Sequence, residues 1–144
     1  MERKPQTLQN HAKFDPAFHF FLAPLSLIFV IYSIVNVVKN PVTETYMHLV
    51  VALWAFVLAF KMRVYSMKVQ DRVIRLEERL RMASLLSEPL KSKSMALTEG
   101  QYIALRFACD AELPGLVEKA LASDMKPKDI KPAIQTWRPD YWRV

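Results

Sequence analysis

The chain has 144 residues, of which 52% are hydrophobic, and its formal net charge is +6 at pH 7. This length leaves room for one small domain beside a membrane part, and the 24% of charged residues exclude a protein buried wholly in lipid. Only two glycines occur, and a backbone short of glycine favours long helices over tight turns. The single cysteine, Cys109, excludes an internal disulfide and fits a reducing compartment.

Two long apolar segments follow the N-terminal residues 1–17. Residues 18–38 carry no formal charge, and residues 42–60 carry only Glu44. A helix of about 20 residues crosses a hydrocarbon core of about 30 Å, so each segment is long enough. We predict transmembrane helices over residues 18–38 and 46–60. A signal peptide is the alternative for the first, but its apolar region is longer than usual and lacks a small-x-small cleavage site.

The loop between these segments, residues 39–45, is short enough to force an antiparallel pair of helices. Basic residues accumulate at the end of the pair that holds both termini; they are Arg3, Lys4 and Lys13 before the first helix and Lys61, Arg63 and Lys68 after the second. The positive-inside rule then places the loop outside and residues 1–17 in the cytoplasm. We therefore predict a membrane hairpin with both termini cytoplasmic.

Two histidines lie in the predicted hairpin, where a histidine can ligate haem or a pigment. His19 and His48 each lie near the start of their helix, so in an antiparallel pair they lie near opposite faces of the membrane. They cannot share one cofactor within a hairpin. We interpret both as interfacial residues and keep pigment or haem ligation as the alternative. No cofactor or metal is predicted, because no His, Cys, Asp or Glu set has metal-ligand spacing.

Small residues give each predicted membrane helix a face that allows close packing. Ala52, Ala55 and Ala59 are spaced by three and four residues, and Ser26 and Ser33 are seven apart. Small faces let helices approach closely in lipid. We expect this face to pack the hairpin within one chain, and contact with another membrane subunit is the alternative.

Residues 61–87 predict a cytoplasmic stem that continues the second membrane helix, because residues 42–88 contain no glycine or proline. Apolar residues form a near-heptad seam along it: Met62, Tyr65, Val69, Val73, Leu76, Leu80 and Ala83. The opposite face carries charged residues: Asp71, Arg72, Arg75, Glu77, Glu78, Arg79 and Arg81. The seam is too apolar to face water, so we expect it to pack against the chain's own tail, a second copy or a partner.

The stem also carries the basic excess of the chain. Residues 61–93 hold nine Lys and Arg against four Asp and Glu. The residues that could face lipid headgroups are Lys61, Arg63, Lys68, Arg72 and Arg75, and anionic lipid would favour each by about 1 kcal/mol. Lying on the membrane would need a sharp bend, for which the sequence offers no proline or glycine. We therefore favour a stem that projects from the membrane.

A polar linker over residues 88–97 precedes a small helical domain over residues 98–144. A capping box at Thr98 and Gln101 predicts a helix that runs to about residue 108. Asp110 can cap a second helix that ends near residue 122.

A last short helix begins at Pro127 or Asp129 and ends towards residue 137. The expected core is Tyr102, Leu105, Leu113, Leu116, Val117, Leu121, Ile130, Ile134 and Trp137. So small a domain is marginally stable alone, and we expect it to lean on the stem seam or on a partner.

The C-terminus gathers three aromatic side chains that are typical of interface anchors, namely Trp137, Tyr141 and Trp142. Capping of the small domain's own core is the other role, which we favour. A helix-turn-helix that binds DNA is disfavoured, because residues 111–122 offer two glutamates and a single lysine where basic and amide groups are needed.

Several segments resemble an uncharacterised bacterial family of small two-helix membrane proteins with a cytoplasmic helical tail. They read QNH at residues 9–11, DRVIRLEERLR at 71–81, LTE at 97–99, ALRFA at 104–108, DAELP at 110–114, AI at 133–134 and WRPD at 137–140. The resemblance covers nearly the whole chain. It implies the architecture described above and carries over no activity and no catalytic residue.

The sequence thus predicts an all-α membrane protein: a two-helix transmembrane hairpin, a long stem and a small helical domain. No catalytic motif is present, and Glu77 and Glu78 point about 100° apart on a helix, so they cannot form a carboxylate pair. We expect a non-catalytic accessory or scaffolding subunit that binds other membrane and cytoplasmic proteins or itself. The alternative is a self-associating anchor that binds anionic lipid through its basic stem. No nucleic acid or small-molecule substrate is indicated.

Overall fold

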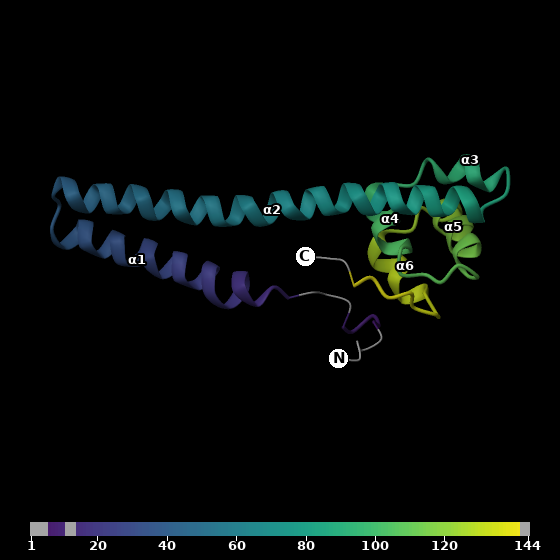
Figure 1. The fold of residues 1–144 in the computed structure, drawn as a ribbon, viewed down its shortest axis with the longest axis horizontal. Helices are drawn as coiled ribbons and strands as arrows, with labels where there is room; N and C mark the ends of the chain where they lie inside the picture. The colour runs from purple at the N-terminus through teal and green to yellow at the C-terminus, as the bar shows by residue number, and fades with distance from the viewer. Residues whose placement is uncertain (1–5, 11–13, 142–144) are drawn as a thin grey trace. The chain divides into compact units, whose positions relative to one another are not determined.

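The computed structural model describes residues 6–10 and 14–141. These residues form two compact units. Residues 14–67 make up one, which we call the apolar unit; residues 68–141 together with residues 6–10 make up the other, which we call the tail unit. Within the described residues the regular structure is helical, and a single β-bridge joins Ala108 to Trp137 (Figure 1). The prediction of an all-helical chain is therefore confirmed for this part of the protein.

The apolar unit contains the two segments that the sequence predicts to be membrane helices. A short π-helix, η1 (Ala17–Leu22), leads directly into α1 (Ala23–Lys39), and three residues separate α1 from α2 (Thr43–Leu85). Both the continuous helix Ala17–Lys39 and α2 are long and apolar enough, by length and composition, to cross a membrane. Helix α2 begins earlier than predicted, within the expected loop. Its first turn carries Glu44, which the positive end of the helix dipole favours.

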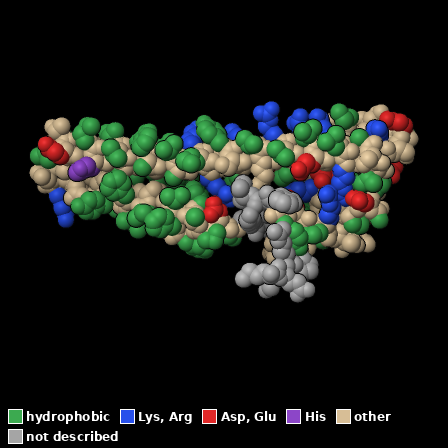
Figure 2. Space-filling model, viewed as in Figure 1, with side chains coloured by type: hydrophobic (Ala, Val, Ile, Leu, Met, Phe, Trp, Pro, Cys, Tyr) green, Lys and Arg blue, Asp and Glu red, His purple; other side chains and the backbone are tan. Residues whose placement is uncertain are grey.

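The apolar unit buries few of its side chains, and an aromatic contact joins the start of its first helix to α2. Ser33 of α1 and Ala52 of α2 are the two buried residues among the described residues of this unit. Near the start of the first helix, Phe18 packs edge-to-face on Phe60, with ring centroids 5.4 Å apart. Most large apolar side chains of both helices remain exposed, and they cover this part of the chain in Figure 2.

The tail unit adds four short helices to the second part of α2. They are α3 (Leu90–Ser94), α4 (Glu99–Leu105), α5 (Leu113–Ala122) and α6 (Pro127–Ala133). The capping box that begins α4 is complete, because Thr98 accepts from the Gln101 backbone N–H and Gln101 accepts from the Thr98 backbone N–H. This local prediction is confirmed, although α4 ends three residues earlier than expected.

Three local predictions in the tail are wrong, each because a tertiary contact intervenes. The predicted linker contains α3, whose Ser94 carbonyl accepts a hydrogen bond from the Tyr102 hydroxyl at 2.8 Å. Asp110 does not cap α5, because its carboxylate accepts from Arg81. The last helix ends at Ala133, and the chain after it is extended: Arg138 donates its backbone N–H to the Phe107 carbonyl at 2.7 Å.

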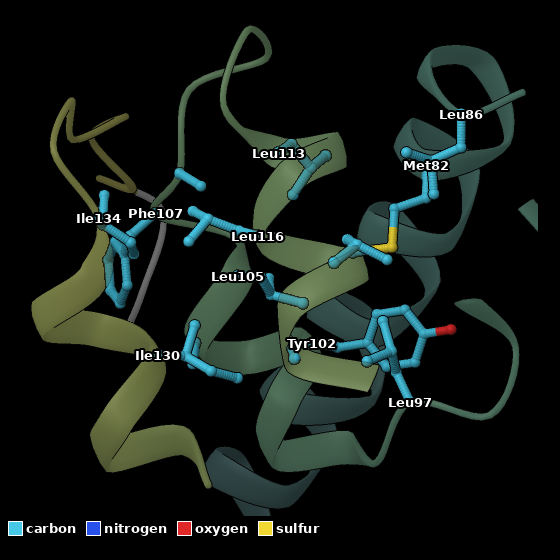
Figure 3. Packing of buried hydrophobic residues seen from close by; sticks show 14 residues of the cluster. Met82, Leu86, Leu97, Tyr102, Leu105, Phe107, Leu113, Leu116, Ile130 and Ile134 are labelled. Carbon is cyan, nitrogen blue, oxygen red and sulfur yellow. The ribbon is translucent and has the colours of Figure 1, made fainter. Parts of the chain in front are cut away.

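The core of the tail unit includes part of α2 (Figure 3). Seven of the nine predicted core residues are buried, and Leu121 and Trp137 are partly buried and pack against them. The sequence analysis missed several core residues: Met82, Leu86, Leu97, Ala104, Phe107, Ala108 and Ala120. Because Met82 lies in α2 and Leu86 directly follows it, the end of the predicted stem and the small domain fold as one unit.

The two glycines of the chain provide a matched test of this packing. A Cβ at Gly100 of α4 would lie 2.8 Å from Cγ of Pro127 in α6, whereas one at Gly115 of α5 would meet nothing within 4 Å. Alanine is favoured over glycine in a helix by about 1 kcal/mol. Gly115→Ala should therefore stabilise the protein by up to that amount. Gly100→Ala should destabilise it by about 1–3 kcal/mol, because a proline ring cannot turn aside.

Unfolding of the full-length protein in detergent, followed by circular dichroism, measures both variants. Gly115→Ala is the control for the gain in helix propensity. Equal stabilisation by the two substitutions would contradict the close approach of α4 to α6.

Candidate functional site

The part of α2 within the tail unit, residues 68–85, presents two faces. One face carries Ile74, Glu78 and Met82, which are buried against the rest of the unit. The opposite face carries the predicted seam, whose four large side chains stay exposed: Val69 by 61%, Val73 by 47%, Leu76 by 59% and Leu80 by 66%. Of the three partners expected for the seam, the chain's own tail is thus wrong, because the tail packs on the side of α2 that carries Ile74, Glu78 and Met82.

An ion network holds Glu78 and Arg81, two residues of the predicted charged face, against the rest of the tail unit. Arg81 donates to Glu78 at 3.0 Å, to Asp110 at 2.8 Å and to the Ala108 carbonyl at 2.7 Å. Glu78 is buried and accepts a second hydrogen bond, at 3.3 Å, from Arg138. Arg81 thus bonds to a carboxylate 29 residues further along the chain as well as to its helical neighbour Glu78. The network links α2 to the segments that follow α4 and α6.

A second ion pair ties both ends of the described chain into the tail unit. Arg106, also buried, donates to Asp140 at 2.9 Å. The side-chain amide of Gln6 donates to the Asp140 carbonyl at 3.0 Å and accepts from the Asp140 backbone N–H at 2.7 Å. Glu112 accepts backbone hydrogen bonds from Gln135 and Thr136.

These ionic side chains surround a cleft of about 460 Å³. Its lining consists of Ile74, Glu77, Glu78, Arg81, Arg106, Arg138, Pro139 and Asp140. Three arginines face three carboxylates there, so the cleft attracts neither anions nor cations strongly. Burial raises the pKa of the Glu78 carboxyl above its ordinary value of 4.5, although the charges of Arg81 and Arg138 oppose the rise. We interpret the network as a structural element of the tail unit.

The exposed face of α2 carries a shallow groove of a different kind, of about 420 Å³. It is lined by Val69, Arg72, Val73, Arg75, Leu76 and Arg79. The floor is apolar and three guanidinium groups flank it; that of Arg79 also lies 5.6 Å from the centroid of the Tyr102 ring. Figure 2 shows Lys and Arg side chains gathered along this part of α2. Apolar side chains bordered by cations suit a protein partner or a membrane surface.

The other predicted contact residues differ in how far they are accessible. Tyr65, Lys61 and Lys68 are exposed in the structure. Arg63 is mostly buried, with a nitrogen 3.7 Å from the Asp15 carboxylate.

The C-terminal aromatic residues lie partly within the tail unit. Trp137 is partly buried and packs on Phe107, with ring centroids 4.9 Å apart, so it serves the core of the tail unit. Tyr141 is partly buried, and Trp142 lies outside the described residues.

The two histidines stay apart in the apolar unit. The Nδ1 atom of His19 lies 2.8 Å from the Asp15 carbonyl, and its ring packs on Phe14 and Phe18. His48 is exposed near the start of α2. The helical rise puts the two about 20 Å apart along the helix axes. Among the described residues, no group of three or more His, Cys, Asp or Glu side chains is arranged to hold a metal.

Comparison with known proteins places the chain in a family. It belongs to the family of unknown function DUF6526, which it matches over residues 1–144. This agrees with the predicted resemblance in coverage and in the lack of an assigned activity. Neither the curated proteins nor the solved structures include a significant match. Functional inference therefore rests on the geometry described above.

The raised pKa of Glu78 predicts how stability depends on pH. A carboxyl whose pKa is higher in the folded state contributes stability when protonated, and that contribution falls as the pH rises from 4.5 through the folded pKa. The glutamine of Glu78→Gln does not titrate. As the pH rises through this window, the free energy of unfolding of the variant should therefore increase relative to that of the parent protein. Unfolding of the full-length protein in detergent across this pH range measures the difference.

Glu88 is the matched control, with the opposite sign. Hydrogen bonds from Ser92, the shorter at 2.6 Å, lower the pKa of this exposed carboxyl. Its contribution is present above pH 4.5 and is lost as the pH falls through its folded pKa. The free energy of unfolding of Glu88→Gln should therefore fall relative to that of the parent protein as the pH rises towards 4.5. A difference between Glu78→Gln and the parent that does not change with pH would refute the assignment.

Proposed function

We propose that this protein is a non-catalytic accessory or scaffolding subunit of a bacterial inner membrane, which binds other membrane and cytoplasmic proteins. The observation that carries the proposal is the apolar seam of the tail unit, which stays exposed although the unit has built a complete core on the other face of α2. Exposed apolar surface of this extent is typical of an interaction site.

The apolar unit supports the membrane part of the proposal. Its two buried residues among those described, Ser33 and Ala52, are small, as is typical of packed membrane helices, and most of its large apolar residues are exposed. Water would solvate these surfaces poorly, whereas lipid tails or other membrane helices would cover them. We propose that Ala17–Lys39 and the first part of α2 form a transmembrane hairpin.

Contacts within the tail unit support a topology with both termini on one side of the membrane. Gln6 precedes the first apolar helix and Asp140 follows the second, yet the two residues exchange hydrogen bonds. An even number of membrane crossings between them is required for this contact. The basic residues at this end of both helices favour the cytoplasmic side.

A second candidate function, the self-associating anchor that binds anionic lipid, has one specific observation in its favour. Four of the five basic residues predicted to face lipid are exposed: Lys61, Lys68, Arg72 and Arg75. The fifth, Arg63, is engaged by Asp15. Exposed cations next to a membrane helix attract anionic headgroups.

Purification of the full-length protein from its native membrane in mild detergent tests the leading proposal. We expect a complex of defined stoichiometry that contains at least one other protein. Its absorption spectrum reports on His19 and His48, since a visible band would identify a bound haem or pigment. Recovery of this chain alone, with no reproducible companion, would refute the role as an accessory subunit.

Vesicles of defined composition test the lipid alternative. Replacement of Lys61, Lys68, Arg72 and Arg75 by glutamine should abolish any assembly that needs anionic lipid, because their combined attraction to the surface amounts to a few kcal/mol at about 1 kcal/mol each. The control replaces Lys119, Lys126 and Lys128, which are exposed in the tail unit far along the chain from the membrane helices. Assembly that survives the fourfold substitution would reject the alternative.

A further inference from the structure

We infer that the exposed seam of α2 binds the same seam of a second copy, so that two chains form a short parallel coiled coil over residues 69–83. This inference rests on the proposed function, of which it names one partner. The remaining surfaces of the subunit stay available to other proteins.

The spacing of the exposed residues fits a heptad repeat. With Val73 and Leu80 at a positions, the d positions are Val69, Leu76 and Ala83, and all five residues are exposed. A β-branched residue at a followed by leucine at d, as in Val73 and Leu76, is the combination that favours two parallel strands.

The tail unit leaves this seam open to a partner. Its core takes Ile74, Glu78 and Met82, which in the same heptad occupy the b, f and c positions. These positions lie on the far side of a helix from a and d. A second copy can therefore approach the seam without displacing any residue that the tail unit has buried.

The charges beside the seam are complementary to those of a second copy whose helix runs parallel to the first. Arg72 occupies a g position and Glu77 an e position, on opposite borders of the seam, and both side chains are exposed. In a parallel pair, each g residue lies beside the e residue five places further along the partner helix. Arg72 of each copy thus faces Glu77 of the other, which gives two symmetry-related attractions. The next such pair joins Arg79 to Ser84, which introduces no repulsion.

The proposed membrane anchor sets the same orientation. Two chains inserted in one membrane by the same hairpin run in parallel, and confinement to one layer raises their effective concentration. A seam of about two heptads, which would be weak between free peptides, gains from this confinement. The orientation that the charges require is therefore the one that the anchor would supply.

Charge reversal tests the inference in vesicles of pure phosphatidylcholine, which contain no anionic lipid and no other protein. Arg72→Glu and Glu77→Arg should each weaken dimerisation of the full-length protein about tenfold, because each turns two attractions into repulsions. The double variant R72E/E77R should restore it to within about twofold, since the pairs re-form with reversed charge. Residues five apart point about 140° apart on one helix, so this rescue cannot arise within a single chain. Lys119→Glu, at an exposed position of α5 outside the seam, is the control for a charge change and should leave dimerisation unchanged.

Cysteine cross-linking checks the register independently. In a Cys109→Ser background, Leu76→Cys and Leu80→Cys should form intermolecular disulfides under mild oxidation, because a and d residues of paired helices approach within disulfide range. Arg75→Cys, exposed on the same helix but away from the seam, is the control. Equal cross-linking at all three positions would indicate random collision and overturn the inference.

The outcomes separate this inference from the proposed function. A monomer in phosphatidylcholine vesicles, single variants without effect, or dimers that form only with anionic lipid would each overturn the second copy as the partner of the seam. The accessory-subunit proposal would survive any of these results if the protein still purified with companion proteins. Conversely, a dimer rescued by R72E/E77R but purified without companions would support the inference and refute the proposed function.

Discussion

The packing of one face of α2 into the tail unit is the interaction on which the other features depend. Helices α3 to α6 are short, and a domain of residues 98–144 alone would bury too little apolar surface to be more than marginally stable. Met82 and Leu86 complete its core from outside that range. Residues on opposite sides of a helix cannot both pack against the same domain. The face of α2 that enters the tail unit therefore determines which residues of α2 remain exposed. The seam thus remains exposed because the small domain completes its core with residues from the other face of the stem.

The ion network fixes that choice of face. An apolar core alone would pack as readily on the seam, whose valines and leucines are larger in number than the apolar residues of the opposite face. Glu78 and Arg81 are satisfied only when Asp110, Arg138 and the Ala108 carbonyl approach from the tail. Buried ion pairs add little net stability, because desolvation offsets their attraction, but a mispacked arrangement would leave Glu78 buried without a partner. The network therefore selects one arrangement over another more than it stabilises the fold.

Local signals in the sequence predict the helices and most of the core. They do not predict which residues pair when the partners lie far apart in the chain. The long helices follow from the absence of glycine and proline, and α4 follows from the Thr98 capping box. Glu78 and Arg81 look like solvent-exposed charges because their partners lie up to 60 residues away. Asp110 likewise looks like a helix cap in the sequence, because its partner Arg81 lies 29 residues away. Periodicity did reveal the seam, but a pattern of apolar residues cannot say which of several possible surfaces will cover it.

The contact between Gln6 and Asp140 bears on how the first apolar helix is interpreted. Cleavage of that helix as a signal peptide would remove Gln6, and the backbone N–H and carbonyl of Asp140 would each lose a hydrogen bond from or to its amide. The side chain of Asp140 holds the buried Arg106, so the N-terminal segment supports a position that matters to the core of the tail unit. In the proposed hairpin the first helix is retained and these bonds are kept. The contact between Gln6 and Asp140 therefore supports that proposal over a cleaved leader, and no hydropathy pattern contains this contact.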